Sequence, residues 1–66
     1  MNKMIAQAEV VHCMKYYLLD IRTKCPDEYY RKRRVEVLEA ASAVIDAVCY
    51  EALVELIEEM EAGENA

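Results

Sequence analysis

The sequence predicts an all-α fold, a two-helix antiparallel hairpin with a short first helix and a long second helix. Helix-forming residue types dominate the 66 residues, and the chain has only one Gly and one Pro, which disfavours a sheet with many tight turns. Apolar residues recur at helical spacing on both sides of a single break signal at Pro26. We therefore expect one domain over residues 1–66.

The first helix is expected over about residues 2–22, followed by a turn at residues 23–26. Its apolar stripe follows an a/d pattern at helical period: Met4, Gln7, Val11, Met14, Leu18 and Ile21. The turn is predicted from Pro26, which disfavours helical backbone at the residue before it. Lys24 suits the negative end of the dipole of a helix that ends there.

The second helix is expected over about residues 26–62, with a frayed tail at residues 63–66. Pro26 suits a first helical turn, and no Gly or Pro follows until Gly63, which argues against a kink near Ser42. Such a helix would be roughly 55 Å long. Its apolar row steps by four or three residues in an eleven-residue repeat that predicts a nearly straight seam: Leu38, Ser42, Ile45, Cys49, Leu53, Leu56 and Met60.

The hairpin leaves part of the second helix without a partner. With the turn at residues 23–26, the N-terminal end of the first helix lies opposite Ile45. Residues 48–62 of the second helix therefore extend beyond the first helix. Apolar surface of that extent predicts a protein interface, and a hairpin of this size is marginal alone. We expect an oligomer, homomeric or heteromeric. The predicted partner-binding residues are Val48, Leu53, Leu56, Ile57 and Met60, or Tyr29 and Tyr30 at the other end.

Charge is divided along the chain. Residues 1–34 hold all eight basic residues and four acids, whereas residues 35–66 hold nine acids and no cation. In an antiparallel pairing of two copies of the second helix, a basic block meets an acidic block and fixes their orientation. The block pairs Arg31, Arg33 and Arg34 with Glu61, Glu59 and Glu58, respectively. The acids of residues 51–64 are otherwise read as the solvated face of an amphipathic helix.

An alternative function is a homodimeric helical-hairpin RNA-binding regulator. The string from Tyr29 to Arg34 combines aromatic rings with Arg31, Lys32 and Arg33, which suits phosphate contact and base stacking. The net charge of −5 disfavours general nucleic-acid binding. Ion pairing or solvation of the cluster is therefore the preferred interpretation.

Catalysis and cofactors are not expected. His12 is the single histidine and is adjacent to Cys13, so the two cannot share a helix face for nucleophile activation. Glu9 and His12 match an E-x-x-H motif that could form a dimeric metal site with Glu39, but Glu9 lies opposite the apolar stripe. We expect no metal site.

The expected compartment is the cytoplasm. Three cysteines without C-x-x-C spacing suggest free thiols in a reducing environment, where they serve as small packing residues. The apolar run over residues 40–54 contains Asp46 and Glu51 and is shorter than a bilayer requires. The N-terminal residues contain no adequate signal peptide.

The order of elements resembles the small E-type co-chaperones of type III secretion needles (the YscE/PscE/EscE group). The resemblance covers about residues 20–50. A short first helix ends at Cys25-Pro26-Asp27-Glu28-Tyr29, and a longer helix with an Ala/Leu/Glu-rich apolar run over residues 37–45 follows. It implies a cytosolic, non-enzymatic adaptor that binds a tetratricopeptide-like chaperone and helps to keep a needle subunit unpolymerised. The basic cluster at residues 31–34 and the acidic C-terminal extension depart from that pattern.

Overall fold

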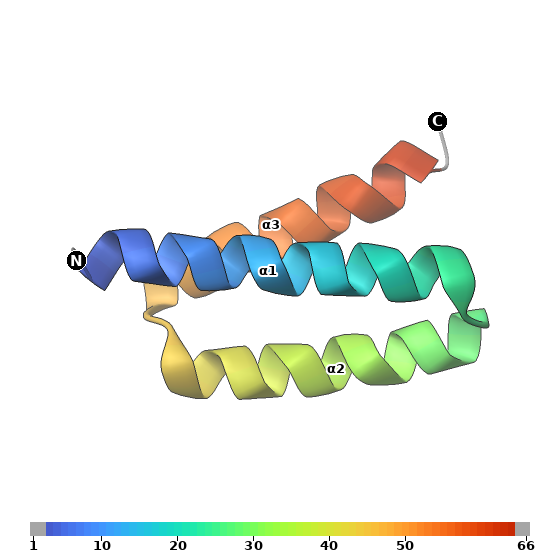
Figure 1. Cartoon of the computed structure of the whole chain (residues 1–66), viewed down its shortest axis with the longest axis horizontal. Helices are drawn as coiled ribbons and strands as arrows, with labels where there is room; N and C mark the ends of the chain where they lie inside the picture. The colour runs from blue at the N-terminus through green and yellow to red at the C-terminus, as the bar shows by residue number, and fades with distance from the viewer. Residues whose placement is uncertain (1–2, 65–66) are drawn as a thin grey trace.

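A computed structural model describes residues 3–64, with side chains over residues 6–63, and shows three α-helices. Helix α1 spans Lys3–Lys24, α2 spans Asp27–Val44 and α3 spans Ala47–Glu64. α2 runs back along α1, and α3 turns again to run in the direction of α1 (Figure 1). α1 contacts both other helices, whereas α2 and α3 contact each other least. In Figure 1, α3 rises away from α2 toward its C-terminal end.

The predicted two-helix hairpin is wrong, although the all-α class agrees with the structure. The expected second helix is divided at Ile45 and Asp46 into α2 and α3. The described chain is 36 Å along its longest axis, which could not contain a continuous helix of roughly 55 Å. Gly63 and Glu64, expected in a frayed tail, belong to α3, and residues 65–66 of that tail lie outside the described residues.

The first junction lies at Cys25 and Pro26, where the sequence predicted a break. The Cys25 N–H donates to the Ile21 carbonyl over 2.8 Å and closes α1. Pro26 has extended backbone (φ −60°, ψ 152°), and its carbonyl accepts the N–H groups of Tyr29 and Tyr30, each at 3.1 Å. Pro26 therefore precedes α2, because its ring fixes φ and it has no N–H to donate.

The second junction lies at Ile45 and Asp46 and contains neither Gly nor Pro. Ile45 leaves the helical conformation (φ −124°, ψ 158°), while its N–H still donates to the Ala41 carbonyl. Asp46 then caps α3: its Oδ1 accepts the Cys49 N–H at 2.9 Å, the contact that an N-cap carboxylate makes. The Asp46 N–H donates to Gln7 Oε1 of α1 at 2.9 Å. A residue of the junction itself therefore caps α3, and a hydrogen bond to Gln7 joins the junction to α1.

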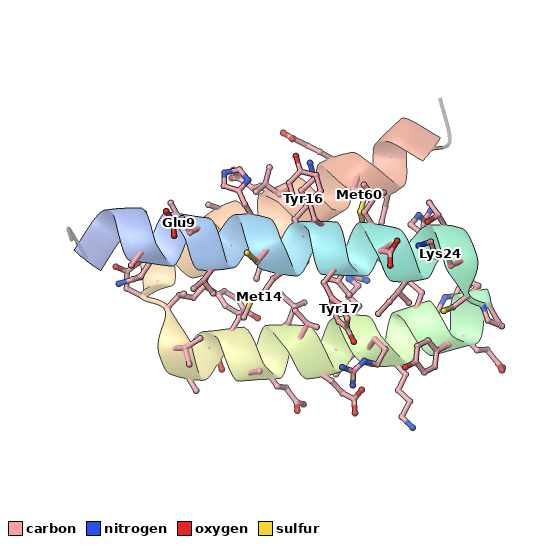
Figure 2. All side chains as sticks on the ribbon, in the orientation of Figure 1. Glu9, Met14, Tyr16, Tyr17, Lys24 and Met60 are labelled. Atoms are coloured by element: carbon pink, nitrogen blue, oxygen red, sulfur yellow. The ribbon has the colours of Figure 1, made fainter. Side chains whose placement is uncertain are left out.

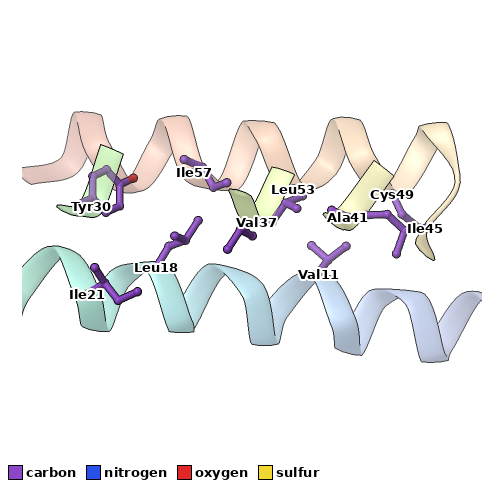
Figure 3. Packing of buried hydrophobic residues seen from close by; sticks show 10 residues of the cluster. All are labelled: Val11, Leu18, Ile21, Tyr30, Val37, Ala41, Ile45, Cys49, Leu53 and Ile57. Carbon is purple, nitrogen blue, oxygen red and sulfur yellow. The ribbon is translucent and has the colours of Figure 1, made fainter. Parts of the chain in front are cut away.

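The core lies between α1 and the other two helices (Figure 3). Leu18 of α1 and Leu53 and Ile57 of α3 are almost completely buried, and burial of such a side chain stabilises the fold by about 1.5–3 kcal/mol. The α1 stripe is confirmed where its side chains are described, and Met4 lies outside that range. Ten apolar residues are buried among the described side chains of residues 6–63: Val11, Leu18, Ile21, Tyr30, Val37, Ala41, Ile45, Cys49, Leu53 and Ile57.

Candidate functional site

The structure buries several residues that were predicted to meet a partner. Leu53 and Ile57 are 0% and 1% exposed, and Tyr30 is 2% exposed. The premise that residues 48–62 have no partner within the chain is wrong, because α3 packs along α1. These three side chains are core residues, so they are not available on the surface of the folded chain.

The remaining predicted partner-binding residues are at least partly accessible. Val48 and Tyr29 are exposed, at 69% and 47%. Leu56 and Met60 are half-buried and pack against the core from α3. They lie at different places on the molecule, since Tyr29 is in the first turns of α2 and Val48 is in the first turn of α3. The two alternative sets therefore remain at separate places on the molecule.

A hollow of about 550 Å³ lies at the corner between α2 and α3, and its surface is mostly apolar. We call it the corner hollow. Its seven lining residues come from the end of α2, the junction and the start of α3: Ser42, Ile45, Asp46, Ala47, Val48, Tyr50 and Glu51. Val48, one of these lining residues, is 69% exposed. An exposed apolar side chain beside an apolar hollow is a feature of interaction sites.

Two rows of partly exposed apolar residues lead from the corner hollow along α2 and α3. On α2, Leu38 and Val35 precede the lining residue Ser42 by four and seven residues, so all three share a helix face. On α3, Val54 follows the lining residue Tyr50 by four residues. Val35 is 56% exposed, and Leu38, Tyr50 and Val54 are half-buried. We call these rows and the corner hollow the α2–α3 face.

A polar cluster closes the opposite end of the bundle. The Tyr30 hydroxyl donates to Glu61 Oε2 over 2.6 Å, and Arg34 Nε lies 3.5 Å from the same oxygen. The Arg22 guanidinium lies over the Tyr30 ring, 5.2 Å from its centroid. Burial, and then the hydrogen bond to Glu61, raises the pKa of the Tyr30 phenol. These contacts join all three helices, so we assign the cluster a structural role and call it the Tyr30–Glu61 cluster.

The basic cluster of residues 31–34 is largely neutralised within the chain. Arg31 pairs with Asp27 at 2.9 Å, and Arg33 pairs with Glu36 at 2.7 Å. Arg33 also donates to the hydroxyl of Tyr17 (Nε at 3.0 Å, Nη2 at 2.7 Å), which points from α1 toward α2 in Figure 2. Since most of these cations have an acidic neighbour, the cluster is a weaker phosphate-binding patch than its sequence indicated.

The ion pairs predicted between two copies are replaced in part by pairs within one chain. Arg34 meets Glu61 of its own chain, whereas the sequence predicted contact with Glu58 of another copy. Glu58 and Glu59 make no ion pair with any side chain that the structure describes. The acidic half of the molecule therefore keeps most of its negative charge exposed.

The other candidate chemistry does not form a site among the described residues. Glu9, His12 and Glu39 are each exposed, and residues 6–63 contain no group of three or more potential metal ligands. Burial, and then the adjacent Asp46 carboxylate, raises the pKa of the Cys49 thiol, which disfavours the reactive thiolate. No helix within residues 3–64 is long and apolar enough to cross a bilayer.

Comparisons with protein-family models, with curated proteins and with solved structures found no match for this chain. The resemblance to the needle co-chaperones therefore depends on the sequence pattern over residues 20–50 alone.

Proposed function

We propose that this chain is a non-enzymatic protein-interaction module that binds a helical segment of a partner on its α2–α3 face. The observation that carries the proposal is Val48, which lines the apolar corner hollow and is 69% exposed. A helix-in-groove contact uses such a site, since apolar residues spaced by three and four can enter it from one face of the bound helix.

The arrangement of the helices supports this choice of surface. α1 covers one side of both α2 and α3, and α2 and α3 contact each other least. Their apolar rows are therefore only half covered within the chain. A further helix along these rows would bury Val35 and Val48, and each side chain so covered adds to the driving force for association.

The narrower role implied by the resemblance is a form of the same proposal. In that form, the partner is a tetratricopeptide-like chaperone in the cytosol, and the complex helps to keep a secretion needle subunit unpolymerised. The contact residues differ from those first predicted, because Leu53 and Ile57 are in the core. Self-association also remains a prediction, but it no longer has the support of a long uncovered stripe.

Site-specific photo-crosslinking in the native cell tests the proposal. A photoreactive residue at Val48 should give a discrete protein adduct, whereas the same residue at exposed His12 of α1 should not. Val35→Asp, on the exposed α2 row of the same face, should greatly reduce the adduct while the circular dichroism spectrum remains helical. Equal adducts from both positions, or no adduct from position 48, would contradict the proposal.

The mass of the adduct distinguishes the forms of the proposal. A helical-repeat chaperone or a needle subunit would support the co-chaperone role. An adduct of twice the mass of the chain would instead assign the α2–α3 face to self-association.

A further inference from the structure

We infer that the partner segment on the α2–α3 face is a basic amphipathic helix, with apolar residues toward the corner hollow and Lys or Arg residues beside the outer surface of α3. The inference rests on the proposed function and adds the chemistry of the partner. It depends on three observations about charge in the folded chain.

The first observation is a row of acids on α3 without cationic neighbours. Glu51 lines the corner hollow, and Glu55 and Glu58 follow it by four and seven residues on the same side of the helix. All three are exposed and make no ion pair with any described side chain. The row adjoins the apolar Tyr50 and Val54, so apolar and acidic surfaces lie side by side.

The second observation is that this acidic row is unfavourable in the isolated chain. Glu51 and Glu55 are like charges at i,i+4, and so are Glu55 and Glu59, and each such pair costs about 0.2–0.5 kcal/mol. The last turn of α3 has no basic residue, although cations are favoured at that negative end of the helix dipole. A cationic partner would relieve both effects.

The third observation makes a second copy a poor electrostatic match for this face. Most of the described cations already have a partner: Lys24 pairs with Asp20, and Arg31, Arg33 and Arg34 pair with acids in their own chain. Lys32 is the one cation of residues 6–63 without a described interaction. Because each copy also carries a net charge of −5, like charge opposes self-association at this face.

Two synthetic peptides of the same length as α3 test the inference against the intact chain. One is an amphipathic Leu/Lys helix, and the other has Glu in place of every Lys. Titration calorimetry should show binding of the Leu/Lys peptide only. The affinity should fall as the ionic strength rises from about 0.05 M to about 0.5 M, because salt screens exposed charges.

Matched variants locate the contact. Glu51→Lys with Glu58→Lys should weaken Leu/Lys binding at least tenfold. Glu9→Lys with Glu28→Lys makes the same change in net charge on α1 and the first turn of α2, and should weaken binding less than twofold. Val48→Asp should also weaken binding, since it places a charge at the corner hollow. Circular dichroism confirms that each variant remains helical.

The outcomes separate the inference from the function that it extends. Equal losses in both double variants would overturn the inference, because binding would then follow net charge alone. Loss with Val48→Asp but not with Glu51→Lys and Glu58→Lys would also overturn it and leave the proposed function standing. A Leu/Glu peptide that binds as tightly as the Leu/Lys peptide would overturn it as well.

Discussion

The two faces of α3 differ in what they contact, although they belong to the same 18-residue helix. The inner face carries Cys49, Leu53 and Ile57, each less than one-tenth exposed and packed along α1. The outer face carries Val48, Glu51 and Glu55, which are exposed. The difference teaches that apolar residues close together in sequence have different roles: the inner set holds the fold together, whereas Val48 stays on the surface.

The largest expected effect is on the inner face. Leu53→Ala should lower the free energy of unfolding by about 2–5 kcal/mol, because it removes a fully buried side chain and leaves a cavity. Val48→Ala, five residues earlier on the outer face, should change the free energy of unfolding by less than about 0.5 kcal/mol. Urea unfolding followed by circular dichroism measures both. Equal costs for the two variants would contradict the assignment of the faces.

The next effect concerns the residue that allows α3 to turn back. Asp46→Ala should cost about 1 kcal/mol, within a range of about 0.5–2, since the Cys49 N–H loses its acceptor at the start of α3. Asp46→Asn keeps a capping oxygen and should cost less. Urea unfolding of the two variants and the parent chain gives the comparison. A penalty for Asn as large as that for Ala would show that capping is not the cause.

A smaller effect is expected at the Tyr30–Glu61 cluster, which joins α2 to the C-terminal part of α3. Tyr30→Phe should cost about 0.5–1.5 kcal/mol by removing the hydrogen bond to Glu61. Because the pKa of the Tyr30 phenol is raised in the folded chain above its ordinary value of 10.0, this stabilisation is complete below pH 10. It decreases as the pH rises beyond that value, where the unfolded chain ionises first.

Urea unfolding at neutral pH and above pH 10 checks this dependence. The difference in stability between the parent chain and Tyr30→Phe should narrow at the higher pH. A constant difference would mean that ionisation of Tyr30 is not coupled to folding.

Much of the fold could be predicted from the sequence, but the second junction could not. The stripe through Val11 and Leu18 and the break at Pro26 both have strong local signals, a helical period and an imino acid. The break at Asp46 has no such signal, because Ile45 and Cys49 belong to the apolar row whether the helix continues or breaks there. Both residues are buried in the structure. The apolar row therefore continues across the junction without a change of spacing.

A usable signal was nevertheless present at that junction. Asp46 is a preferred N-cap residue, and Ile45 and Tyr50 occupy the positions of a hydrophobic staple, before the cap and four residues after it. The burial of Leu53 is not predicted for a related reason. Whether Leu53 is exposed depends on whether α3 returns along α1, which is a tertiary property that periodicity alone does not specify.

The central claim is that α3 packs against α1 of its own chain, which gives α3 one buried face and one exposed face. The most direct test is a nuclear Overhauser effect between the Tyr30 ring and the Glu61 γ-methylene in a sample that mixes labelled and unlabelled chains. The fold predicts a strong intramolecular signal, since the Tyr30 hydroxyl bonds to Glu61. In a continuous second helix these residues would be about 46 Å apart. Absence of the signal, or a signal only between differently labelled chains, would contradict the claim.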